Sequence, residues 1–148
     1  MRVRTGAIII SNDWLLLVKQ NVPTREKPIW MPPGGGVEFG ETTEKALVRE
    51  VKEETGLVVT PERLLWVHEF LEKPIHAIEF YYECSISGGT LKLGADPEHN
   101  PDQQILMALK FVPFCELISL DLYPDFIKQS FIDDGKLPEH VTHLNYNS

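Results

Sequence analysis

Hydrophobic positions along the chain form short apolar runs that are interrupted by two stretches of helical spacing. The apolar runs predict strands at residues 4–10, 14–20, 29–31, 63–71, 75–87, 90–93 and 104–113. Asn12 and Asp13 suit a turn, so the first two strands are predicted to form a β-hairpin. Residues 94–102 are polar and rich in proline and aspartate, which is typical of a loop.

The spacing of apolar residues predicts a helix at residues 42–56. Its apolar stripe predicts the face that packs on the core: Leu47, Val48 and Val51. Thr42 or Thr43 is suited to cap the start of this helix, and Gly56 is suited to end it. A second stripe predicts a helix at 123–134 that stops at Gly135, and the tail that follows is polar. Strands, a helix, more strands and a final helix predict an α/β protein with a mixed sheet between helices.

Composition narrows the class of protein. The 148 residues suit one domain, residues 1–148, and the net charge of −8 argues against a basic face that grips duplex nucleic acid. No apolar run reaches the roughly 18 residues of a membrane span, and the N-terminus is not a good signal peptide. Cys84 and Cys115 show no disulfide framework, so a reduced, cytoplasmic setting is expected.

The first helix carries three glutamates on one face. Glu50, Glu53 and Glu54 are spaced i, i+3 and i+4, so their carboxylates repel one another. Hard divalent cations such as magnesium take oxygen ligands from clusters of this kind. By itself the spacing is more typical of a solvated helix face, and the glycines at 34–36 by themselves are typical of a flexible turn.

Taken together, the stretch from residue 34 to residue 57 resembles the Nudix box, the signature of the Nudix hydrolases. Every specified position of that pattern is matched, by Gly35, Glu41, Arg49, Glu50, Val51, Glu53, Glu54, Gly56 and Leu57. The resemblance implies an α/β/α sandwich with a mixed sheet between helices. It also implies divalent-metal-dependent hydrolysis of the pyrophosphate bond in a nucleoside diphosphate linked to another group, such as a nucleotide, ADP-ribose or a nucleotide sugar.

The resemblance also implies roles for single residues. Glu50, Glu53 and Glu54 would hold Mg²⁺ or Mn²⁺ together with the carbonyl oxygen of Gly34, and Glu53 would lie near the attacking water. Arg49, four residues before Glu53, can pair with it and fix its rotamer.

The general base is less well defined. Many family members carry it on a later loop, which here is 94–104, where Glu98 is our candidate beside Asp96 and Asp102. Gln103 and Gln104 follow where an acid is expected. The alternative interpretation of Glu98 is a solvated loop residue, and in that case Glu53 would serve as the base. Nearer the box, Glu38 and Glu41 are expected to orient the glycine loop rather than to bind the metal.

Four residues are candidates for binding the substrate. Trp30 can stack on a base or belong to the core, and Phe39 has the same two interpretations. Arg25 can reach a phosphate or be solvated, and Gly35 lets the backbone approach a ligand. Pro74, 17 residues past Leu57, is a weak sign of ADP-ribose-type substrates, and a turn explains it equally well.

Two other functions fit the same resemblance. An inactive nucleotide-binding or regulatory module would usually lack one of the box glutamates, and none is missing. A prenyl diphosphate isomerase on the same fold would need a further cysteine and glutamate, and Cys84 has no evident partner. The expected ligand is therefore a small nucleoside diphosphate derivative, and a homodimer is expected by analogy alone.

Overall fold

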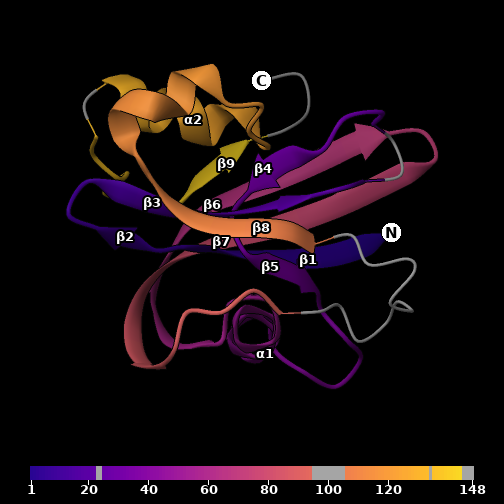
Figure 1. Cartoon of the computed structure of the whole chain (residues 1–148). Coiled ribbons are helices and arrows are strands. Elements are labelled where there is room, and N and C mark those ends of the chain that lie inside the picture. The colour runs from indigo at the N-terminus through magenta and orange to yellow at the C-terminus, as the bar shows by residue number, and fades with distance from the viewer. Residues whose placement is uncertain (23–24, 95–105, 134, 145–148) are drawn as a thin grey trace.

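The computed structural model describes residues 1–22, 25–94, 106–133 and 135–144. Two β-sheets lie between helix α1 (Thr43–Thr55) and helix α2 (Asp125–Asp133), as Figure 1 shows. The predicted α/β class, with a mixed sheet between helices, is therefore confirmed. Among the described residues, no helix is long and apolar enough to cross a membrane.

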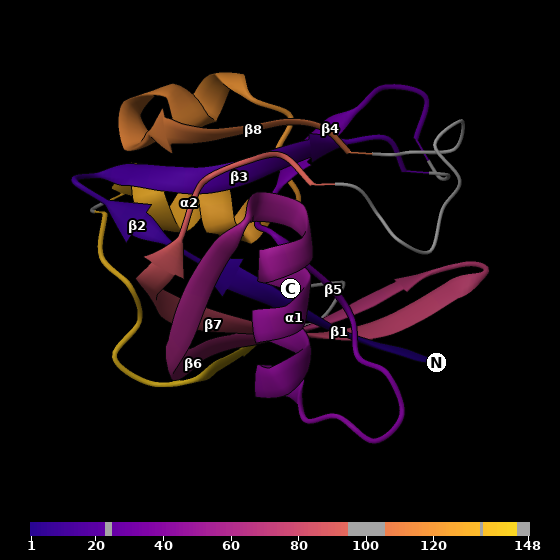
Figure 2. The ribbon, with the colours of Figure 1, turned by 60° about the horizontal axis from the view of Figure 1, so that its bottom comes forward.

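The first sheet is mixed. Its strand order is β5 (Gly34–Gly36), β1 (Arg2–Ile8), β7 (Ile75–Gly89), β6 (Leu57–Glu72) and β9 (Thr142–Leu144). Strand β1 runs parallel to β7, and β9 runs parallel to β6, whereas the other two pairs are antiparallel. The glycine strand β5 is thus an edge strand beside β1, and helix α1 lies next to it (Figure 2).

The second sheet is built around β3 (Trp14–Gln20). This strand pairs antiparallel with β2 (Ile10–Ser11), β4 (Ile29–Met31) and β8 (Leu106–Pro113). Its run of consecutive apolar residues is explained by burial on both faces. A 3₁₀ helix, Phe114–Ser119, follows β8.

Two apolar cores fill the space between the layers. Leu16 packs with Leu47 and Val51 of α1, whereas its neighbours on β3 pack on the other side with Ile127 and Phe131 of α2. The predicted core stripe of the first helix is therefore correct, with Val48 partly buried at its edge. Because α1 is held against the sheet by this stripe, the face that carries the carboxylates has a fixed position.

The ends of α1 were also predicted correctly. Thr42 is the N-cap, and its hydroxyl accepts a hydrogen bond from the Lys45 amide at 3.2 Å. Gly56 ends the helix in the left-handed conformation with φ of 75°, and its amide donates to the Lys52 carbonyl.

Three predictions about strands were wrong. Residues 90–93 form no strand, because the amides of Thr90, Lys92 and Gly94 donate to carbonyls at the end of α1 instead. Residues 4–10 are not one strand, because the chain leaves the first sheet after β1 and only β2 forms the hairpin with β3. No strand was predicted in the polar tail, yet β9 adds a strand to the edge of β6.

Candidate active site

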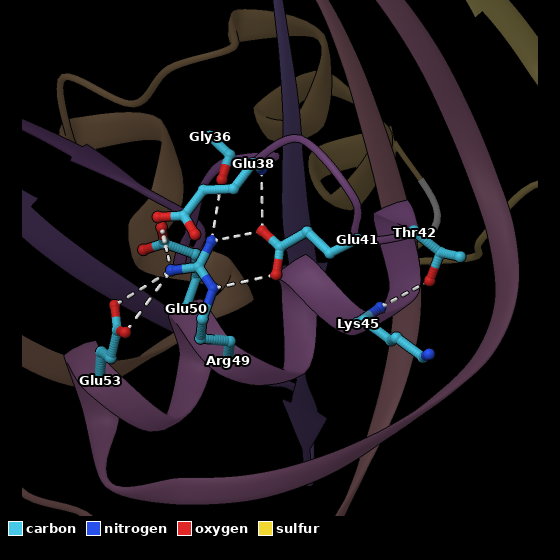
Figure 3. A network of polar contacts seen from close by, with 8 residues as sticks. All are labelled: Gly36, Glu38, Glu41, Thr42, Lys45, Arg49, Glu50 and Glu53. Atoms are coloured by element: carbon cyan, nitrogen blue, oxygen red, sulfur yellow. Dashed lines mark hydrogen bonds and ion pairs between the residues drawn. The ribbon is translucent and has the colours of Figure 1, made fainter.

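Arg49 occupies the centre of a network that joins the glycine strand to helix α1 (Figure 3). Its guanidinium contacts Glu41 through two nitrogens, at 2.6 and 3.1 Å. Nη1 approaches Glu50 at 3.0 Å and Glu53 at 3.4 Å, and Nη2 donates to the Gly36 carbonyl at 3.1 Å. The predicted Arg49–Glu53 contact is therefore present, and it is one of four.

The two partners in this network fix each other's charge. The hydrogen bond from Arg49, followed by that from the Glu38 amide, lowers the pKa of Glu41 below its ordinary value of 4.5. The hydrogen bond to Glu41 in turn raises the pKa of Arg49. Because Glu41 Oε1 also accepts from the Glu38 amide at 2.9 Å, Glu41 ties the loop after β5 to the helix, as expected from the sequence.

The glycine strand lies directly against the carboxylates. The Gly34 amide donates to Glu54 Oε1 at 2.7 Å, and Glu54 is buried. A Cβ on Gly35 would lie only 2.6 and 2.7 Å from the two carboxylate oxygens of Glu50. Glycine is therefore required at position 35 if Glu50 is to keep this position.

The three helix carboxylates have the oxygen chemistry that a divalent cation prefers. Glu50 and Glu53 approach the same guanidinium nitrogen, and Glu54 reaches the adjacent strand. In the described part of the chain, no three metal-ligating side chains already converge on one point. Glu50 and Glu53 instead pair with Arg49, and Glu54 accepts from the Gly34 amide.

A cavity of about 330 Å³ opens between the two sheets on the other side of β1. Its lining includes three arginines, two glutamates and two aromatic residues: Arg2, Arg4, Arg25, Glu72, Glu79, Phe70 and Tyr123. Arg4 pairs with Gly36 across β1 and β5, and Arg2 Nη2 lies 3.9 Å from the position that a Cβ on Gly36 would take. The cavity therefore adjoins the strand that contacts Arg49.

The inner wall of this cavity is a buried polar network around Glu79. Its Oε1 accepts a hydrogen bond from the Tyr123 hydroxyl at 2.8 Å and lies 2.8 Å from His68 Nδ1. Arg4 Nε is 3.7 Å from the other oxygen. Burial, together with the Glu79 charge, raises the pKa of Tyr123. This wall therefore presents an anion and, at its edge, cations to a ligand in the cavity.

Comparison with known proteins now decides the family. The model of the NUDIX domain matches residues 1–132. The chain belongs to the Nudix family.

Relatives with assigned activities share part of this Nudix chain. An ADP-ribose pyrophosphatase of Methanocaldococcus jannaschii is 41% identical over 93 residues, which are 62% of this chain and 54% of the relative. The human 8-oxo-dGDP phosphatase NUDT18 is 35% identical over 92 residues, or 62% of this chain and 28% of the relative. The chain spans about half or less of the length of the curated relatives it matches.

Solved structures agree on the Nudix fold. An ADP-ribose pyrophosphatase from Streptococcus suis superposes with a TM-score of 0.70 at 22% identity, covering 97% of this chain and 98% of that chain. A UDP-X diphosphatase superposes with a TM-score of 0.68 at 23% identity, covering 97% of this chain and 66% of the other. At these identities the likeness shows the fold alone.

The residues expected to bind substrate are dispersed in this Nudix structure. Arg25 lines the cavity and lies 3.7 Å from Asp121. Trp30 is partly buried, and its ring packs against the core on the α2 side with the Lys110 ammonium 4.9 Å from its centre, so it does not line the cavity. Phe39 is fully exposed in the loop after β5.

One predicted site residue lies outside the described structure, and one part of the site was not predicted from the sequence. Glu98, the candidate base, lies outside the described residues together with the rest of 95–105. The polar cavity wall around Glu79 was missed. The signal that could have found it is Glu79, an acid that shares the alternation of the apolar residues Ala77 and Tyr81 and is buried with them.

Proposed function

We propose that this chain is a Nudix hydrolase that uses Mg²⁺ or Mn²⁺ to cleave the pyrophosphate bond of a nucleoside diphosphate derivative. The observation that carries the proposal is the placement of the three glutamates: Glu50 and Glu53 both contact Arg49, and Glu54 contacts glycine strand β5. Hard cations prefer carboxylate and carbonyl oxygens, which Glu50, Glu53, Glu54 and the Gly34 carbonyl would supply.

Bound there, the cation would neutralise phosphate charge and activate water for attack on phosphorus. Arg49 has a positioning role, because its contacts with Glu41 and the Gly36 carbonyl hold it in place while it restrains Glu50 and Glu53. Glu53 is the most exposed of the three glutamates, so solvent reaches its carboxylate most easily. Its side chain is 30% accessible, against 15% for Glu50. Glu53 is therefore the carboxylate best placed to accept a proton from water that enters from solvent, and Glu98 is the alternative base that we propose from the family pattern.

The cavity between the sheets is the proposed place for the part of the substrate beyond the pyrophosphate. A volume of about 330 Å³ falls within the range of small-molecule sites. Arg2, Arg4 and Arg25 would counter the charge of phosphate or of another anionic group. The Phe70 and Tyr123 rings offer faces for a planar base.

We favour the ADP-ribose class among the possible substrates, because the relative from M. jannaschii is an ADP-ribose pyrophosphatase. Pro74 points weakly in the same direction. A nucleotide sugar or a modified nucleotide is the alternative that the same cavity would accept.

The test is incubation with Mg²⁺ and a panel of nucleoside triphosphates, ADP-ribose, sugar nucleotides and dinucleoside polyphosphates, with products identified by mass spectrometry. Glu53→Gln should lower turnover by roughly 10²–10⁴-fold, the range typical of losing a proton acceptor. Glu44→Gln is the matched control, because Glu44 lies exposed in the first turn of the same helix. Absence of hydrolysis across the whole panel, or near-normal turnover of Glu53→Gln, would refute the proposal.

We also propose a cytoplasmic location and a homodimer. Cys84 and Cys115 are both free thiols, which suits a reducing compartment. The dimer rests on analogy with the family, and sedimentation velocity at micromolar concentration tests it.

A further inference from the structure

Thr5 carries a hydroxyl group for which the described part of the chain provides no hydrogen-bond partner. The residue is 3% exposed, and in the described residues its Oγ1 is the one buried side-chain oxygen or nitrogen that forms no hydrogen bond. Buried polar groups are nearly always hydrogen-bonded, and each exception calls for an explanation such as an absent ligand or water. The position of Thr5 indicates which ligand this is.

Thr5 lies on the face of the first sheet that meets the carboxylates of α1. It is directly opposite Gly35 in the antiparallel pair of β1 and β5, and residues opposite each other point to the same face. The Cβ direction of Gly35 leads to the carboxylate of Glu50, 2.6 Å away. The next residue on β5, Gly34, donates its amide to Glu54. The Thr5 side chain is therefore next to the backbone positions that contact two of the three candidate metal ligands.

Packing gives no reason for an oxygen atom at this position. The neighbour of Thr5 on its other side is Phe80 of β7, an apolar residue packed against the α1 core. Valine has the same β-branched shape, favours strands equally and would not bury an unpaired hydroxyl. Ala7, two residues further along the same face, shows that the strand is otherwise apolar here.

We propose that Thr5 is a positioning residue for the metal form of the site. When a divalent cation gathers Glu50, Glu53 and Glu54, the Thr5 hydroxyl hydrogen-bonds to a water molecule or a carboxylate oxygen in the immediate surroundings of the cation. A hydroxyl both donates and accepts, so it satisfies either partner. Magnesium usually keeps several waters, which require acceptors in the protein. The inference rests on the proposed function, since it needs a metal site at α1.

Thr5→Val tests the hydroxyl group with little change in shape, and two other variants complete the design. Thr5→Ser keeps the hydroxyl, and Thr60→Val is a control at an exposed threonine of strand β6. Two quantities are measured on each protein: the melting temperature in EDTA, and the affinity for Mn²⁺ by calorimetry without substrate.

We expect Thr5→Val to melt in EDTA at the wild-type temperature or higher, because it removes a buried unpaired group. Its Mn²⁺ affinity should fall roughly 10-fold, a loss typical of removing a group that supports metal ligands. Thr5→Ser and Thr60→Val should both bind Mn²⁺ within about 3-fold of wild type, a change of under 1 kcal/mol.

Four results would overturn the inference. Wild-type affinity in Thr5→Val, or a 10-fold loss in a folded Thr5→Ser, would show that the hydroxyl has no role toward the metal. A marked fall in the EDTA melting temperature of Thr5→Val alone would show that the hydroxyl has a partner in the metal-free fold. If the wild-type protein itself binds no Mn²⁺, the proposed metal site fails and the inference fails with it, whereas the other three results leave that site standing.

Discussion

The three consecutive glycines of β5 should respond to alanine in three different ways, because each Cβ would meet a different neighbour. At Gly35, a Cβ would lie 2.6 Å from a carboxylate oxygen of Glu50, where about 3.4 Å is ordinary contact. The end of a flexible side chain can yield, so the fold should survive while Glu50 moves by about 1 Å. A displacement of this size at a catalytic group costs about 100-fold in rate, or about 2.7 kcal/mol.

The other two glycines act as references for Gly35→Ala. At Gly34, a Cβ would overlap the Thr5 carbonyl oxygen and lie 2.8 Å from Gly6 Cα. Backbone atoms cannot rotate away, so Gly34→Ala should cost about 1–3 kcal/mol of stability, as overpacking does, and lower the melting temperature by about 4–10 °C. At Gly36 the nearest atom is Arg2 Nη2 at 3.9 Å, so Gly36→Ala should fold normally.

The assay combines thermal unfolding in EDTA with turnover measured over a Mg²⁺ titration. Gly35→Ala should melt within a few degrees of wild type and lose about 100-fold in turnover, with a higher Mg²⁺ requirement. If Gly35→Ala keeps both turnover and Mg²⁺ requirement within about 3-fold of wild type, then Glu50 is not a ligand held by contact with Gly35, and the reasoning is refuted.

Two further predictions concern titratable groups. Since Arg49 lowers the pKa of Glu41 below 4.5 in the folded protein, the stabilisation from this pair is fully present above about pH 4.5 and is lost as the pH falls through the lowered value. Urea unfolding should accordingly show a constant stability difference between wild type and Glu41→Gln at pH 5–7 that shrinks below about pH 4.5, and a difference that grows toward acid would contradict the assigned direction. Burial raises the pKa of Cys84 to about 12, so iodoacetamide at about pH 8 should label only the exposed Cys115 in the native protein and both cysteines in denaturant. Peptide mass mapping detects the labels, and rapid native labelling of Cys84 would refute its burial.

Much of the site could be predicted from the sequence because the information is local. The register of α1, its caps at Thr42 and Gly56, and the separation of carboxylates from the core stripe all follow from the period of 3.6 residues. The Arg49–Glu53 contact follows from i, i+4 spacing. The contacts of Arg49 with Glu41 and the Gly36 carbonyl could not be predicted, since they cross 8 and 13 residues through a loop whose path is set by pairing with β1.

The pairing of strands was even harder to predict from the sequence than the contacts of Arg49. Alternating apolar positions identified most of them, but alternation does not say which strand pairs with which. The apolar run from residue 4 to 10 is therefore divided between two sheets, and the polar tail gains strand β9 from the free edge of β6. The apolar pattern assigned residues 90–93 to a strand, but the amides of Thr90 and Lys92 donate to carbonyl oxygens at the end of α1 instead.

By itself, the sequence determined the family, the helix that carries the carboxylates and the glycines that must lie beside it, because each depends on residue types at short, fixed spacing. The tertiary structure alone decided that Arg49 joins four groups, that Glu79 and Tyr123 line a cavity with His68 bonded to Glu79, and that the buried Thr5 lies opposite Gly35. The physical reason is that side chains on separate strands become neighbours only through sheet pairing and layer packing, which the hydrophobic pattern requires without specifying the partners.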